Sequence, residues 1–131
     1  MFGLASEWVE KAETFLSEAK SLYKRGVYWL ACFHAHQACE LYLKAVLVEK
    51  TGVHPFTHDL AVLLDELADL GLKVPEEVYR AAEYLTPHYL TSRYPRKRAI
   101  RYSERKASYC LEAAETIVKW VRGVLGTVKR D

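Results

Sequence analysis

Apolar residues recur along this chain with the three- and four-residue spacing of amphipathic helices. Residues 4–25 have this spacing, and Gly26 follows them as a helix stop. Residues 28–50 are so densely apolar that the helix predicted there must be covered on most sides. We therefore predict a long first helix and a central second helix that ends at Thr51-Gly52.

The second half of the chain predicts three more helices. Thr57 has the chemistry of an N-cap for a helix that carries leucines on one face and ends at Gly71. Pro75, followed by two glutamates, is typical of the first turn of a fourth helix, which should end near Pro87. A clean apolar seam predicts a last helix over residues 103–126.

These segments together predict an all-α fold, an antiparallel up-and-down bundle of four to five helices. Residues 88–100 contain Pro95 and many charges but no apolar period, so we predict an ordered connection without a helix there. The chain has only six glycines and no Asn-Gly or Asp-Gly turns, which argues against an all-β fold. Its 131 residues fit a single domain over residues 1–131.

Composition indicates the setting in which the chain works. No apolar run reaches the ~18 residues of a membrane span, and the N-terminus lacks the pattern of a secretory signal. We therefore expect a cytoplasmic protein with no membrane association. Cys32 and Cys39 lie seven residues apart in the apolar central helix and are predicted to be reduced core residues. The absence of Asn and the single Gln and Met favour a thermophilic source.

Charge is distributed unevenly along the chain. The formal net charge is +2, yet residues 93–106 hold seven Lys and Arg against Glu104 alone. Six of the nine tyrosines lie within residues 79–109, interleaved with this basic run. Arginine matches phosphate oxygens and aromatic faces stack on bases, so the mixture suits a nucleotide or single-stranded nucleic acid. The alternative is a solvated charged loop with core tyrosines.

A polar stripe interrupts the central helix. His36, Glu40 and Lys44 recur every four residues, on nearly the same face of an otherwise apolar helix. Buried polar groups cost free energy unless they are paired. The stripe is therefore either a buried salt-bridge network between helices or part of a cleft for an anionic ligand, and both interpretations stay open.

Common catalytic and metal-binding motifs are absent from the sequence. The chain has no glycine-rich phosphate loop, Cys-x-x-Cys, Gly-x-Ser-x-Gly or His-Glu-x-x-His, so familiar enzyme classes are disfavoured and no cofactor is expected. His34 and His36 point about 200° apart on a helix and cannot share a metal ion. His36 with Glu40, and His54 with His58, have ligand spacing without a third ligand, so no metal site is predicted.

Three segments of the chain resemble the HEPN domain family, whose name abbreviates higher eukaryotes and prokaryotes nucleotide-binding. They are FHAHQACELYLKAVL in the central helix, THDLAVLLDEL after it, and YLTSRYP ahead of the last helix. The resemblance covers about residues 5–124 in matching order. It implies a compact antiparallel bundle of four to five helices that is usually dimeric. It also implies a minimal nucleotidyltransferase encoded nearby, with the HEPN chain as its substrate-binding companion.

The family pattern implies particular site residues. They are His36, Glu40 and Lys44 on the central helix, His58 at the start of the third helix, and Ser92, Arg93 and Tyr94 before the last helix.

Other family members are ribonucleases or toxins in which an arginine is followed after four to six residues by a histidine. No histidine of this chain has that spacing. The nearest pairs, Arg80 with His88 and Arg25 with His34, are separated by about seven and eight residues. The ribonuclease motif of the family is therefore missing.

We predict a non-catalytic, nucleotide-binding and partner-binding module, which acts as companion of a minimal nucleotidyltransferase in a toxin–antitoxin type pair. In this hypothesis arginines hold phosphates, tyrosines stack on or shape the pocket, and the polar stripe lines its floor. The candidate ligand-binding residues are His36, Glu40, Lys44, His58, Tyr89, Ser92, Arg93, Tyr94, Arg96, Arg98 and Arg101.

A homodimer is also predicted. Val9, Val118, Val121 and exposed aromatic positions leave apolar seams wider than one bundle of this size needs, and symmetric dimers are the commonest soluble oligomers. Two rival functions stay open. One is a ribonuclease toxin with a non-standard active site at His58 or His88. The other is a helical dimer that only contacts a protein partner, with the basic run of residues 93–106 steering a transferase that has an acidic face.

Overall fold

A computed structural model describes residues 3–95 and 101–130, with the backbone alone over 127–130. The part of the chain that it describes contains helices and no strands, so the prediction of an all-α bundle is confirmed. Five helices have ten residues or more, and one has four. They are α1 (Ser6–Lys24), α2 (Tyr28–Thr51), α3 (Leu60–Asp69), α4 (Glu76–Leu85), α5 (His88–Thr91) and α6 (Glu104–Arg130).

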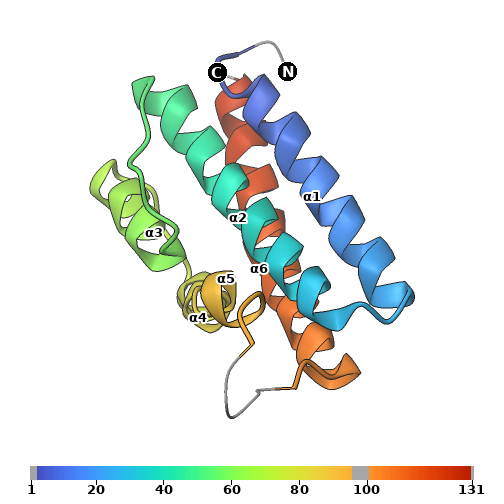
Figure 1. The fold of residues 1–131 in the computed structure, drawn as a ribbon. Coiled ribbons are helices and arrows are strands. Elements are labelled where there is room, and N and C mark those ends of the chain that lie inside the picture. Colours follow the sequence, from blue (N-terminus) through green and yellow to red (C-terminus); the bar gives the residue numbers. More distant parts are fainter. Residues whose placement is uncertain (1–2, 96–100, 131) are drawn as a thin grey trace.

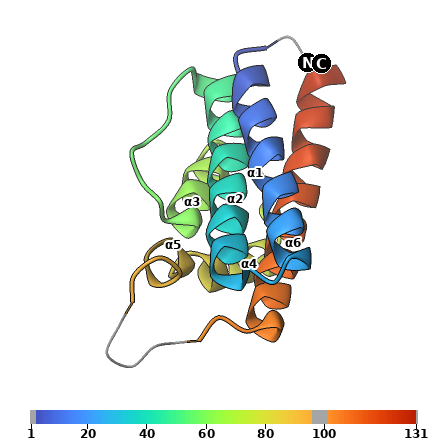
Figure 2. The ribbon, with the colours of Figure 1, turned by 45° about the vertical axis from the view of Figure 1, so that its right-hand side comes forward.

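The three long helices lie side by side, α3 and α5 cover another flank of α2, and α4 packs mainly on α6 (Figure 1). α1 runs antiparallel to α2 and α6, whereas α2 and α6 run in the same direction (Figure 2). Two thiols give the register between the parallel pair: Cys32 donates to the Lys106 carbonyl at 4.0 Å and Cys39 to the Ala114 carbonyl at 3.8 Å. The segment with the three short helices thus returns the chain from the end of α2 to its start, and α6 begins there.

α2 is the centre of the core, as its dense apolar pattern predicts. Fourteen of its 24 residues are buried, because α1, α3, α5 and α6 all pack on it. The three cysteines are free and buried, which confirms Cys32 and Cys39 as reduced core residues. Among the described residues, no helix is long and apolar enough to cross a membrane.

The start of α3 differs from the prediction. Asp59, and not Thr57, is the N-cap, since its Oδ1 accepts hydrogen bonds from the backbone N–H groups of Ala61 and Val62 at 3.0 and 3.3 Å. Thr57 Oγ1 instead accepts from the backbone N–H of Asp59 at 3.1 Å. Both residues are good capping types, and the local sequence does not say which one adopts the extended backbone of an N-cap.

The prediction that no helix forms over residues 88–100 is wrong for the first four residues, which form α5. Hydroxyl groups stabilise this single turn: Thr91 Oγ1 donates to the Pro87 carbonyl, and Ser92 Oγ donates to the His88 carbonyl. One turn is too short to produce a visible apolar period, which explains why the pattern missed it.

Val9, Val118 and Val121 do not form the open apolar seam predicted for a homodimer. Val118 and Val121 are fully buried in this chain's own core, and Val9 packs against that core with partial exposure. The last helix simply needs a wide apolar face, because it packs against α2, α4 and α1 together. These valines therefore give no support to a homodimer.

Candidate anion-binding site

The polar stripe of α2 forms a buried ion network with the loop before α3. Glu40 and Lys44 are each only 5% exposed, and Lys44 Nζ lies 3.0 Å from Glu40 Oε2. The second carboxylate oxygen, Oε1, lies 2.8 Å from Nδ1 of His58, whose side chain is 51% exposed. Both oxygens of Glu40 are thus occupied. The stripe therefore forms a buried network that joins α2 to a loop, and not two helices as predicted, and one member of the network reaches the surface.

His36 binds the backbone of the same loop. Its Nε2 lies 2.8 Å from the backbone carbonyl of His58, and because a carbonyl only accepts, Nε2 carries the proton and donates. Burial lowers the pKa of His36 below its ordinary value, although the His58 carbonyl and Glu40 raise it in part. The ring is therefore a neutral donor that fixes the His58 backbone.

An aromatic and cationic stack continues from His58 toward α5. The His58 and Tyr89 rings are stacked, with centroids 3.9 Å apart and planes 13° apart. The Arg93 guanidinium lies 4.6 Å from the ring centroids of both Tyr89 and Phe33, and 5.2 Å from that of Tyr94. We call these five residues the Arg93 stack.

Arg93 itself is held without a counter-charge. Its Nε donates to the Tyr89 carbonyl at 2.9 Å, which fixes the plane of the guanidinium. Among the described residues no carboxylate lies within ion-pair distance of it. A positive fork that is oriented by rings and unpaired with acid has the chemistry of an anion-binding group.

The structure brings together some of the predicted site residues and not others. His36, Glu40, Lys44, His58, Tyr89, Arg93 and Tyr94 are connected by the contacts above. Ser92 is buried, and its hydroxyl donates within α5, so it does not face the stack. Arg101 is exposed and makes no contact with the stack in the described residues. Arg96 and Arg98 lie outside the described residues.

Phe33 is a site residue that the sequence analysis missed. It lies three residues before His36 and seven before Glu40, on the same side of α2, so the spacing of the polar stripe could have included it. Its apolar side chain is part of the dense apolar run that predicts a covered helix, whereas the structure leaves it half-buried against Arg93 and Tyr89.

His88, the other histidine proposed for catalysis, is buried. It is 8% exposed, and its Nδ1 lies 2.6 Å from the hydroxyl of Tyr102. The Tyr84 ring lies 5.2 Å from it. This histidine therefore belongs to the packing between α5 and the start of α6, separate from the network of Glu40.

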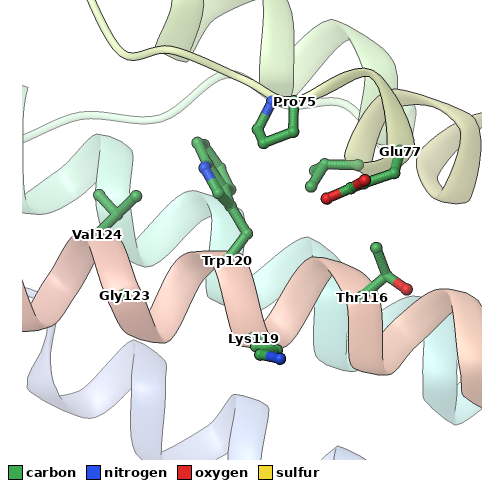
Figure 3. A pocket seen from close by; sticks show the side chains of 8 residues that line it. Pro75, Glu77, Thr116, Lys119, Trp120, Gly123 and Val124 are labelled. Carbon is green, nitrogen blue, oxygen red and sulfur yellow. The ribbon is translucent and has the colours of Figure 1, made fainter.

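A groove lies elsewhere on the molecule. It has a volume of about 690 Å³ and separates the start of α4 from the C-terminal half of α6. In Figure 3 the Trp120 indole stands below Pro75, and the Glu77 side chain reaches toward it. None of the predicted site residues lines this groove, so it is separate from the candidate site.

Fold and site together define a small helical-bundle protein with an unpaired arginine held on aromatic rings. The chain belongs to the HEPN family, because the HEPN domain model matches residues 5–124. This confirms the resemblance seen in the sequence. A comparison with curated proteins found no match.

Three solved structures have the same fold. TT1696 from Thermus thermophilus is 31% identical, with a TM-score of 0.82 over 91% of this chain and 96% of its own. An archaeal HEPN homologue is 30% identical, with a TM-score of 0.74 over 94% and 98% of the two chains. A HEPN domain protein from Thermotoga maritima is 27% identical, with a TM-score of 0.75 over 92% and 98%.

Burial of His36 predicts that acid destabilises the fold. Its pKa is lowered in the folded protein, so below the ordinary value of about 6.5 the unfolded chain binds more protons and stability falls as the pH decreases. Burial lowers the pKa of His34 too, with the same sign. We expect the urea midpoint to fall between pH 7.5 and 5.5, and His36→Gln to reduce that fall. An unchanged pH dependence in this variant would show that folding does not shift the pKa of His36.

Proposed function

We propose that this chain is a non-catalytic nucleotide-binding module whose ligand site is the Arg93 stack. The observation that carries the proposal is the unpaired Arg93 guanidinium, fixed between Phe33 and Tyr89 with only its Nε bonded to the protein. Its terminal nitrogens make no hydrogen bond among the described residues, and they suit phosphate oxygens. The exposed ring of Tyr94 offers a face for a base.

The buried network gives this site its rigidity. Glu40 orients His58, His58 stacks on Tyr89, and the Tyr89 ring and carbonyl hold Arg93. Ordering the arginine before the ligand arrives reduces the entropy that binding costs. In this proposal His36, Glu40 and Lys44 position the site without touching the ligand.

As a companion role, we propose that the module forms a homodimer and presents its nucleotide site to a minimal nucleotidyltransferase, as in a toxin–antitoxin type pair. Membership of the HEPN family supports this role. Light scattering measures the molar mass of the chain in solution and so tests the dimer. Co-expression with a transferase tests whether the two proteins associate. A chain that binds the partner tightly but is indifferent to nucleotides would support the protein-contact hypothesis instead.

Calorimetric titration with ATP, AMP and adenosine tests the nucleotide site. We expect ATP and AMP to bind saturably, with an affinity that decreases as salt rises, because the contact with Arg93 is charged. Adenosine lacks phosphate and should bind far more weakly. If no phosphorylated nucleotide binds at millimolar concentration, the proposed function is wrong.

RNA cleavage is a second candidate function, favoured by the Glu40–His58 pair. A carboxylate that orients a half-exposed imidazole is an arrangement used for general base catalysis. We expect labelled single-stranded RNA to stay intact, as measured on a denaturing gel, because the family's ribonuclease motif is missing. Cleavage that His58→Ala abolishes and His88→Ala preserves would overturn this expectation and assign a ribonuclease.

A further inference from the structure

A second surface lies where α2 ends, and it is apolar and acidic whereas the Arg93 stack is aromatic and cationic. A groove of about 470 Å³ opens between the end of α2, the loop that follows it and the end of α3. Figure 1 shows this loop as the green segment between the two helices. The groove is lined by Leu47, Thr51, Val53, His54, Pro55, Glu66, Asp69 and Leu70.

The groove has an exposed apolar rim. Phe56 is 98% exposed, Val53 68% and Leu70 46%. The Phe56 ring meets the edge of His54 with 5.5 Å between ring centroids, and His54 in turn meets Trp8 at 4.5 Å. Large apolar side chains that lie near one another and are left in water mark an interaction surface. We call the groove and Phe56 together the Phe56 groove.

The remaining wall of the Phe56 groove is acidic, and its two carboxylates lie at a helix end where negative charge is unfavourable. Glu66 and Asp69 lie in the last turn of α3, which contains no basic residue. The C-terminal end of a helix carries partial negative charge and favours cations. Neither carboxylate is within ion-pair distance of a Lys or Arg in the described part of the chain. Both carboxylates are therefore free to pair with cations of another protein.

We propose that the Phe56 groove docks a basic amphipathic helix of a partner protein. The apolar face of that helix covers Phe56, Val53 and Leu70, and its lysines or arginines meet Glu66 and Asp69. Nucleic acid does not fit, because the wall repels phosphate. The proposal does not rest on the nucleotide site, since the Arg93 stack shares no residue with this groove and has the opposite charge.

The test uses a fluorescent synthetic helix with leucines on one face and lysines on the other, read by anisotropy against the full chain. We expect saturable binding that weakens about tenfold in Phe56→Ser and in the double variant Glu66→Gln, Asp69→Asn. Leu90→Ser and Glu83→Gln, an apolar and an acidic residue exposed on other helices outside the groove, are matched controls and should bind as the parent does. All of these side chains are exposed, so no variant should melt below the parent. The double variant should melt slightly above it, because it removes two carboxylates from the C-terminal end of α3.

Three results would overturn the proposal. The first is no binding of the peptide, and the second is equal binding of a peptide with glutamates in place of the lysines. The third is a chain dimer that Phe56→Ser dissociates in sedimentation experiments, because a second copy would then occupy the groove. None of these results depends on whether ATP binds.

Discussion

Replacing Arg93 by alanine is expected to weaken ATP binding about 10- to 100-fold. A hydrogen bond to a charged group is worth about 1.5–3 kcal/mol, and the variant removes the unpaired guanidinium that carries the proposed site. The loss should shrink as salt increases, because salt already screens the contact in the parent chain. Calorimetric titration of ATP into both proteins measures the effect.

Two controls separate a ligand contact from a structural role of Arg93. Arg80→Ala removes an exposed arginine of α4 that pairs only loosely with Glu76, at 3.8 Å, and should leave ATP binding unchanged. Arg93→Lys keeps the charge but loses the planar fork, so it should recover only part of the affinity. If Arg93→Ala loses its cooperative melt, Arg93 is structural and the proposed site is wrong.

The sequence predicts the helices well because helix burial is periodic and local. The dense apolar run of α2 requires cover on most sides, and that requirement alone identifies the central helix. The same reasoning fails at α5, where a single turn is too short for any period. It also fails to choose between Thr57 and Asp59 as the N-cap, since both are good capping residues two positions apart.

The sequence predicts which residue types form the candidate site, but it does not predict which of those residues touch one another. The stripe of His36, Glu40 and Lys44 is visible in the spacing of one helix, whereas the stacking of His58 on Tyr89 joins a loop to a helix far along the chain. Phe33 reaches Arg93 only because the fold brings α2 beside the residues that follow α5. Contacts of this kind depend on tertiary packing, and the spacing of residues within one segment gives no information about it.

Replacing Glu40 by glutamine is expected to destabilise the fold by about 3–5 kcal/mol. The change leaves the buried Lys44 ammonium without its carboxylate partner, and an uncompensated buried charge is costly. His58 loses its partner as well, yet it is half exposed and can turn to water. Urea denaturation followed by circular dichroism measures the difference.

The exposed pair Glu7–Lys11 provides a matched control, because it has the same four-residue spacing in a helix but side chains 77% and 66% exposed. Glu7→Gln should cost no more than about 0.5 kcal/mol. Adding Lys44→Met to Glu40→Gln removes both buried charges and should restore most of the lost stability. A Glu40→Gln variant as stable as the parent would mean that water reaches Lys44, and the polar stripe could then contact the ligand directly instead of positioning Arg93.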